Sequence, residues 1–291
     1  MLKGQKKLPF IILGAFVLLC LVGSLLLGER PHAETIQEVM RDAVLHESGK
    51  IRLLGSFTVN PAVISAFVIT GVLLVLALIL RIFAIPRFRL TPGKLQLLLE
   101  TWVGFFSQMA KSNSPHSYRF LSVYLFSAGS YIFFSTIFEL FGLQAVTVAG
   151  HSISLPVPLS DINGAIAMGV LSYLVILIGG IVVNKVTGVF RGLKEFSLPI
   201  SMSFRLFGAL LSGLLVTELV YYSIRLSFIL PIFVAVLFTL LHAVIQTYVL
   251  TTLTSIFFGE VTEPVKKKNR ADKKKQENLR PEPEQERYGN E

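Results

Sequence analysis

The chain has 291 residues, of which 53% are hydrophobic and only 15% are charged, and its mean hydropathy is +0.66. A soluble domain carries about 25% charged residues, so the composition excludes a soluble globular protein and indicates an integral membrane protein. The net charge of +9 does not indicate nucleic-acid binding, because the basic residues lie at the N-terminus, in short loops and in the C-terminal tail. That distribution is typical of the positive-inside rule, and lipid-exposed backbone then requires an all-α fold.

The N-terminal segment, residues 1–28, contains an apolar run from Leu8 to Leu27 behind three lysines. It is either a cleaved signal sequence or a signal anchor. Its length, and the absence of a clear small-x-small cleavage pattern after it, favour an uncleaved span. Its cysteine, Cys20, is the only one in the chain, which excludes an intramolecular disulfide and a cysteine-based zinc site. Residues 29–58 are polar and of mixed charge, and we expect an extracytoplasmic segment with a short surface helix there.

The membrane domain is predicted to cover residues 59–260 and to begin with a span at Ala62–Ala84, which ends in a basic, cytoplasmic loop. Lys94–Lys111 is too polar to span comfortably. It predicts an amphipathic helix that lies in the membrane interface and is anchored there by Trp102. The next span, Phe120–Leu143, carries Glu139 near its far end.

A loop at Gln144–Ser160 is predicted to precede Asp161, which is either a plain helix cap or a functional carboxylate. The span that starts there should end near Val183, before a basic cytoplasmic loop at residues 184–194. Two final runs, residues 196–226 and 228–258, are long enough for strongly tilted helices. Residues 261–291 are rich in Lys, Arg and Glu and predict a disordered cytoplasmic tail. The count is six spans if the first is retained, with both termini in the cytoplasm.

Ionisable residues inside spans are costly and are functional candidates by default. The last two runs hold Arg205, Glu218 and His242, with Gln246 one turn beyond His242 on the same helical face. Arg205 and Glu218 are thirteen residues apart, so their side chains point about 140° apart and are separated by about 20 Å along the helix. The residues Gly208 and Ser212 share the face of Arg205 and would let another helix approach the guanidinium closely.

Each of these residues also has a plain structural interpretation. Arg205 could be a cation that reaches toward the cytoplasmic surface along its own helix. Glu218 could pair locally with Arg225 on its own face. His242 could be a hydrogen-bonded packing residue, although the polar stripe that it forms with Gln246 favours a hydrated path. No phosphate loop, HExxH motif or nucleophile elbow is present in the sequence.

Four segments together resemble subunit a of the membrane sector of the bacterial F-type ATP synthase. The segment Ser201–Gly208, with Arg205 at its centre, resembles the family's arginine signature and is highly specific. Three supporting segments, covering the final helix, the start of an earlier helix and the surface helix, are Ile245–Phe258, Pro158–Asn163 and Thr91–Lys94. The resemblance covers about residues 60–260, in the family's order. The chain departs from the family pattern at Ala209, usually an asparagine, and at Leu214, where many bacterial members carry a carboxylate or histidine.

The resemblance implies a fold of about five family spans plus the extra N-terminal span, an interfacial helix and two long tilted C-terminal helices. It implies a non-catalytic stator subunit without cofactor or metal, in the plasma membrane of a bacterium. Two half-channels would pass protons, or alternatively Na⁺, to and from carboxylates of the c-ring, and the partners would be the c-ring, subunit b and the lipid bilayer. Arg205 would be the stator charge, and Glu218, His242 and Gln246 would lie in the ion path. Glu218 would stand in place of the family's usual carboxylate. Weaker candidates for that path are Glu139, Asp161, Asn163 and Ser201.

Two rival functions come from other classes. An ion-coupled secondary transporter would show paired repeats or helices broken at mid-span, and we find no convincing repeat. An intramembrane enzyme would need a nucleophile–base pair or a metal cluster, and no such set can be assembled from the polar residues of the spans.

Overall fold

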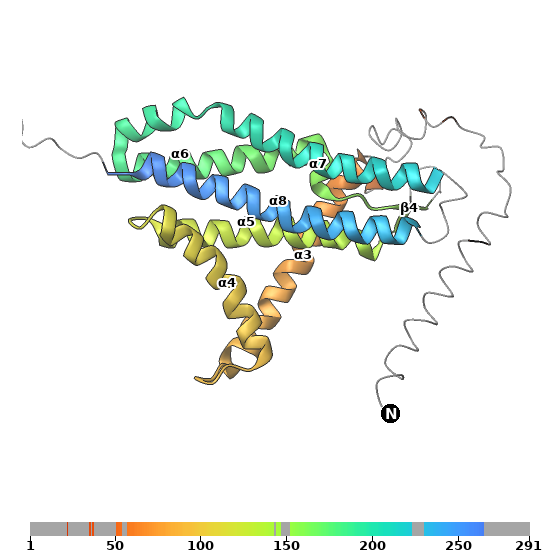
Figure 1. Cartoon of the computed structure of the whole chain (residues 1–291), viewed down its shortest axis with the longest axis horizontal. Helices are drawn as coiled ribbons and strands as arrows, with labels where there is room; N and C mark the ends of the chain where they lie inside the picture. The colour runs from red at the N-terminus through yellow and green to blue at the C-terminus, as the bar shows by residue number, and fades with distance from the viewer. Residues whose placement is uncertain are drawn as a thin grey trace, which may run out of the picture.

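The structure, a computed structural model, describes residues 51–53, 57–142, 144–146, 152–222 and 230–264, besides three isolated residues nearer the N-terminus. Within these ranges five helical segments are long and apolar enough to cross a membrane: Pro61–Arg87, Tyr118–Phe141, Ile162–Lys194, Ser197–Val216 and Val236–Thr262. Four of them form a bundle, and the first diverges from it (Figure 1). The chain is therefore an all-α integral membrane protein, as predicted. Apart from the helical residue Val22, the predicted N-terminal span lies outside the described residues, and so does the C-terminal tail beyond residue 264.

The first described span is α3 (Pro61–Ile79), which continues through a π-helical turn, η1 (Leu80–Ala84), and a 3-10 turn, η2 (Ile85–Arg87). The Asn60 side chain caps its start by accepting the Ala62 N–H at 3.0 Å. Only 11% of its most apolar window is buried. Most of α3 therefore presents apolar side chains to its surroundings, which suits contact with lipid or with another subunit.

Helix α4 (Lys94–Asn113) confirms the predicted helix over Lys94–Lys111. Its tryptophan, predicted as an interfacial anchor, also makes contacts within the chain. The indole N–H of Trp102 donates to Ser130 Oγ on the next helix at 3.0 Å, and its ring packs against Phe133 at 4.9 Å between centroids. Trp102 thus fastens α4 to a neighbouring helix of this chain, because a half-buried indole N–H needs a partner and the hydroxyl is within reach.

Helix α5 (Tyr118–Phe138) ends in η3 (Glu139–Phe141), as the predicted span requires. The following segment, expected to be an irregular loop, contains an antiparallel hairpin of β3 (Gln144–Val146) and β4 (Ser152–Ser154), and then η4 (Pro158–Ser160). A second hairpin, β1 (Ile51–Leu53) with β2 (Phe57–Val59), precedes α3. The surface helix expected between residues 29 and 58 is therefore not formed at 51–53 or 57–59, which are strands. Of the rest of that range only Thr35 and Gln37 are described, and Gln37 is helical.

Helix α6 (Ile162–Lys194) corrects the prediction of a span ending near Val183 with a basic loop behind it. The chain stays helical to Lys194 but reverses at Lys185, whose backbone has φ 51° and ψ −126°. The part after Lys185 folds back on the part before it. The fit is so close that a Cβ placed on Gly188 would lie 1.9 Å from the Gly180 carbonyl oxygen. Neither Gly180 nor Gly188 has a Cβ, and this permits the contact. The lengths of the apolar runs in the sequence could not reveal it.

Helices α7 (Ser197–Tyr222) and α8 (Leu230–Thr262) are the two long C-terminal helices. They run in opposite directions along the bundle (Figure 1). Side chains from α4, α5, α6, α7 and α8 meet in a shared core, whose most buried members are Phe106, Leu121, Leu125, Ile176, Met202, Phe258 and Val261. Burial of these groups fixes how each helix is rotated about its axis, and so which side chains face outward.

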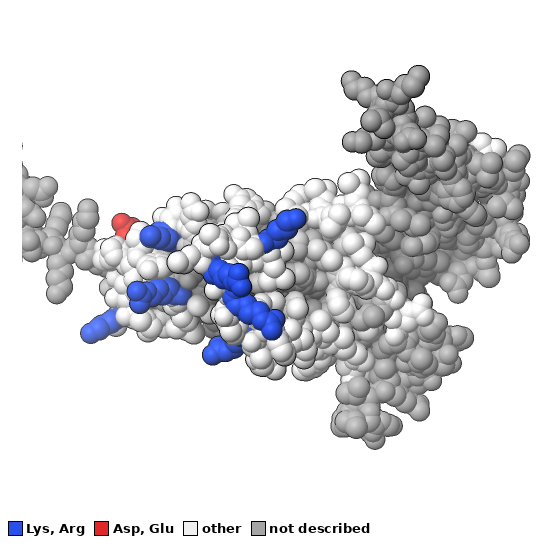
Figure 2. Space-filling view, turned by 90° about the horizontal axis from the view of Figure 1, so that it is seen from below, with Lys and Arg blue, Asp and Glu red and all other residues white. Residues whose placement is uncertain are grey.

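Basic side chains gather toward the end of the molecule where α8 finishes (Figure 2). The loops and helix ends there supply Arg81, Arg87, Arg89, Lys94, Lys111, Arg119, Lys185, Arg191 and Lys194. Two of the carboxylates at the opposite end of the bundle, beside the β3–β4 hairpin, are Glu139 and Asp161. The two ends of the bundle therefore differ in charge.

Candidate functional site

Arg205 lies in α7, on a face that the other described residues leave uncovered. Its side chain is exposed, as are those of Ser201, Phe204 and Ser212 and the backbone at Gly208, all at helical spacing on one side. Within the described part of the chain, Arg205 makes no ion pair and no hydrogen bond. A cation inside a spanning helix is costly unless it meets water or an opposite charge, so the guanidinium needs one of these from outside the described residues.

The opposite face of α7 is held tightly against α6. Met202, Leu206 and Leu210 are all at least nine-tenths buried there. A Cβ placed on Gly169 of α6 would lie 2.3 Å from Ser203 Oγ, and that hydroxyl donates to the Pro199 carbonyl at 2.6 Å. Rotating α7 would drive these groups into α6, so the outward direction of Arg205 is fixed by packing on the other side of its helix.

His242 lies where α8 meets α7, and its imidazole is half-buried. A Cβ placed on Gly213 of α7 would lie 2.9 Å from His242 Nδ1, and the Phe238 ring lies 5.8 Å from the imidazole centroid. Gly213 is eight residues beyond Arg205, which is about 12 Å along the helix axis. The imidazole therefore occupies the seam between the two helices, at a level nearer the hairpin end than Arg205.

Glu139 joins this polar region from α5. Thr239 of α8 donates from Oγ1 to Glu139 Oε2 at 3.5 Å, the outer limit of a hydrogen bond. Thr239 is one turn from His242 on the inward side of α8 and is 6% exposed. A carboxyl group, a hydroxyl and an imidazole thus follow one another from the hairpin end of the bundle into its interior. All three can take part in a chain of hydrogen bonds.

Gln246 extends the same stripe one turn further, to a side chain that is 4% exposed. It makes no hydrogen bond to another described residue. Its amide atoms are not among the fully buried polar atoms without a partner, so they retain some access to the surroundings. Because α7 and α8 are antiparallel and Gly213 adjoins His242, Gln246 lies within about one turn of the level of Arg205.

The remaining candidates divide into three groups. Asp161 caps α6 by accepting the Asn163 N–H at 2.8 Å, and it also accepts from Asn60 Nδ2, which ties the starts of α6 and α3 together. The side chains of Asn163 and Ser201 are exposed. Glu218 belongs to α7, but its side chain lies outside the described residues, as does Arg225. Among the described residues, no group of three or more His, Cys, Asp or Glu side chains could hold a metal ion.

Sequence reasoning missed the residues that position these groups. Gly169 and Gly213 shape the site through contacts between different helices, and no local pattern marks either one. Thr239 was visible three residues before His242, but its contact with Glu139 depends on how α5 packs beside α8.

Comparison with known proteins agrees with this geometry. Residues 64–259 match the family described as ATP synthase A chain. A similar protein is ATP synthase subunit a of Parvibaculum lavamentivorans, which is 27% identical over 207 residues, covering 60% of this chain and 75% of that protein. Because the family match covers more than half of the chain, the chain belongs to the ATP synthase A chain family, the subunit a proteins of the membrane sector of the F-type ATP synthase.

Proposed function

We propose that this chain is the ion-translocating stator subunit of its ATP synthase, with Arg205 as the fixed charge that faces a ring of c subunits. The observation that carries the proposal is the exposed and unpaired guanidinium on a packed membrane helix. Small residues flank it at Ser201, Gly208 and Ser212, so a partner helix can approach the charge closely. The chain itself is non-catalytic and needs no cofactor. ATP is made on the soluble head of the complex.

The guanidinium acts on each ring carboxylate as that carboxylate passes. At about 4 Å and an effective dielectric constant near 20, a fixed cation favours the ionised carboxylate by about 4 kcal/mol. That corresponds to roughly a thousandfold in the ionisation equilibrium. A ring site that arrives protonated must therefore release its proton. Arginine stays charged in this setting, so the same group blocks ions from crossing directly between the two half-channels.

The outer half-channel runs along Glu139, Thr239, His242 and Gln246 toward the level of Arg205. The contacts that support this path are the Thr239–Glu139 hydrogen bond and the place of His242 in the seam between α7 and α8. Glu218 joins the path from α7. The stripe favours protons over Na⁺, because an imidazole exchanges protons readily near neutral pH, whereas hard cations prefer a set of oxygen ligands. Asp161 serves as a helix cap and a cross-link between α3 and α6.

The orientation follows from the charges at the two ends of the bundle. The end with nine basic side chains faces the cytoplasm of a bacterium, and the hairpins lie outside its plasma membrane. Residues 261–291 then form a cytoplasmic tail and residues 29–58 an extracytoplasmic segment behind a signal anchor. The sparsely buried α3 is the surface for subunit b and lipid. The family match disfavours the ion-coupled transporter considered as the alternative.

Arg205→Ala tests the proposal in the whole complex, reconstituted in vesicles with an imposed proton gradient. The substitution removes the charge that drives proton release, so ATP synthesis should fall to background while the subunit remains in the complex. Phe204→Ala is the matched control, because it trims the same exposed face without changing the charge. Near-parental synthesis by Arg205→Ala would refute the assignment of Arg205 as the stator charge. Arg205→Lys should restore little, since an ammonium lacks the planar fork and can lose its proton when desolvated.

A further inference from the structure

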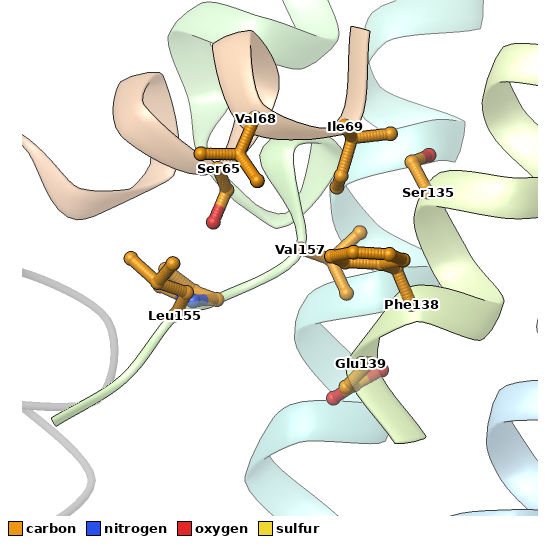
Figure 3. Close-up of a pocket in the computed structure, with 9 residues that line it drawn as sticks. Ser65, Val68, Ile69, Ser135, Phe138, Glu139, Leu155 and Val157 are labelled. Atoms are coloured by element: carbon orange, nitrogen blue, oxygen red, sulfur yellow. The ribbon is translucent and has the colours of Figure 1, made fainter. Parts of the chain in front are cut away.

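Two pockets lie beside α3, and they differ greatly in size. The pocket near the start of the helix, which Ser65 and Glu139 help to line, has a volume of about 10 Å³ and holds at most one water molecule (Figure 3). The pocket at the other end of α3, where the chain turns into α4, has a volume of about 700 Å³. Sites for small molecules usually have about 300–1,000 Å³, so this second pocket has room for a ligand much larger than water.

The lining of this larger pocket, which we call the α3–α4 pocket, combines cations with apolar side chains. The cations are Arg87, Arg89 and Lys94, and no carboxylate is among the lining residues. All three basic side chains are exposed, and none makes an ion pair or a side-chain hydrogen bond with another described residue. The apolar part of the lining comes from Ile79, Leu80, Phe83, Ala84, Phe88 and Leu95. Unpaired cations grouped around one space favour an anionic ligand.

The start of α4 adds to the positive potential of the α3–α4 pocket. Its N-cap, Gly93, has no side chain to bond the N–H groups of the first turn, and that turn contains no acidic residue. The positive end of the helix dipole is therefore left without a compensating charge from the helix itself. Gly93 lines the pocket, and a Cβ placed on it would meet nothing within 4 Å. An anion in the pocket can thus approach the backbone at the start of α4.

Gln96 holds the turn between the two helices in a fixed shape. Its side-chain carbonyl accepts the Arg89 N–H at 3.0 Å, and its amide donates to the Arg89 carbonyl at 2.9 Å. The same amide donates at 2.7 Å to Glu100 Oε1, which lies outside the pocket lining. The backbone that carries Arg89 is therefore placed before any ligand arrives, which lowers the entropic cost of binding.

The surroundings of the pocket favour a phospholipid over a water-soluble anion. The pocket lies at the end of Pro61–Arg87, a segment long and apolar enough to cross a membrane. Apolar side chains at this end of the segment are about half exposed: Ile79 47%, Ile82 54% and Phe83 56%. Inorganic phosphate would leave them uncovered, whereas the acyl chains of a lipid held by its headgroup would cover them. Basic pockets at the membrane surface bind anionic headgroups in this way.

We infer that the α3–α4 pocket binds the headgroup of an anionic phospholipid. Arg87, Arg89 and Lys94 contact the phosphate, and the acyl chains lie along the end of α3. The bound lipid anchors a part of the chain that projects from the bundle (Figure 1). On the face seen in Figure 2, from below, basic side chains clearly outnumber acidic ones, which agrees with an anionic membrane surface there. This site goes beyond ion translocation, and its tests require no proton flow.

Fluorescence quenching tests the site in the purified full-length chain, reconstituted in vesicles. Trp102 is the only tryptophan of the chain, so Trp102→Phe combined with Phe83→Trp places the sole tryptophan in the pocket lining. The affinity of brominated phosphatidylglycerol for this position should exceed that of brominated phosphatidylcholine by roughly fivefold or more. The matched control is Leu74→Trp in the same background, because Leu74 is 65% exposed on α3 and outside the pocket lining. It should show no preference.

The same measurement tests the cations. Arg87→Gln combined with Arg89→Gln should bring the preference close to one, and Lys94→Gln should lower it by up to roughly fivefold. Lys111→Gln, at the other end of α4 and outside the lining, should leave it unchanged. Equal affinity for the two lipids in the Phe83→Trp chain would overturn the inference. So would a preference that inorganic phosphate removes and chloride at the same ionic strength does not, because the site would then take the free anion.

Photocrosslinking in the complete complex gives a second measurement, which does not depend on the folding of Trp102→Phe. A benzophenone amino acid replaces Phe83, native membranes are irradiated, and mass spectrometry identifies what is joined to that position. Phospholipid adducts should form, with a larger anionic share than when Leu74 is replaced in the same way. Crosslinking at position 83 to another subunit alone would show that a partner protein fills the pocket, and would overturn the inference.

Discussion

At the residue scale, Gly169 and Gly213 are important because they have no side chain, which leaves space for side chains of a neighbouring helix. The imidazole of His242 occupies the seam between α7 and α8 because Gly213 has no side chain at the point of contact. Arg205 points outward because the small Gly169 lets Ser203 sit tightly against α6 on the other side of the helix. The Arg205 side chain and the His242 imidazole are thus placed by glycines that carry no side chain of their own.

Gly213→Ala should therefore disturb the proposed proton path without touching a titratable group. The added methyl group would lie 2.9 Å from His242 Nδ1, so the imidazole or α8 must shift. Overpacking of this kind costs about 1–3 kcal/mol, and we expect proton pumping to fall by roughly tenfold while the subunit still inserts. ATP-driven quenching of a pH-sensitive dye in vesicles measures the rate. Gly104→Ala is the control, because a Cβ there would meet nothing within 4 Å. Equal rates of proton pumping in the two variants would show that protons do not pass along the contact between α7 and α8 at His242.

At the scale of elements, the reversal of α6 is the feature that holds the basic end of the bundle together. The returning part, after Lys185, carries Arg191, whose guanidinium donates to the Glu263 carbonyl at 2.7 Å just beyond α8. Asn184 donates to the same carbonyl and to that of Val261, both at 2.9 Å. The Tyr173 hydroxyl bonds to the Gly192 carbonyl at 3.2 Å. These bonds need the two parts of α6 to lie against each other.

Gly188→Ala should break that contact, because its Cβ would lie 1.9 Å from the Gly180 carbonyl oxygen, and a backbone atom cannot move aside alone. We expect a loss of stability of at least about 1–3 kcal/mol, the usual range for overpacking. The subunit should then unfold at a lower temperature in detergent. Thermal unfolding of the purified subunit measures the shift, with Gly71→Ala as the control at a site where nothing lies within 4 Å. A melting temperature equal to that of the control would show that the two parts of α6 are not packed this closely.

At the scale of the whole molecule, the gathering of basic residues at one end of the bundle supports the proposed orientation in the membrane. Basic side chains gather at one end of the bundle, and the β3–β4 hairpin with Glu139 and Asp161 lies at the other (Figures 1 and 2). A positive end is retained in the cytoplasm, so the hairpin end should be outside.

Cysteine labelling tests this orientation in a Cys20→Ala background. His151→Cys, in the segment between β3 and β4, should react with a membrane-impermeant thiol reagent added from outside only. His116→Cys, exposed in the turn between α4 and α5, should react from the cytoplasmic side only. Labelling of position 151 from the cytoplasm alone would reverse the proposed topology and, with it, the direction of the outer path.

The sequence alone determined the class of protein, the described spans, the amphipathic helix and the arginine signature. Each depends on local composition or spacing, which a single segment carries by itself. Tertiary structure decided the reversal at Lys185, the hairpin after α5, the binding of Trp102 to Ser130 and the contact between Glu139 and Thr239. It also decided that Ser65 faces a pocket beside a carboxyl group seventy-four residues away. These features arise where helices distant in sequence pack together, and their free energy depends on close contact that no local pattern encodes.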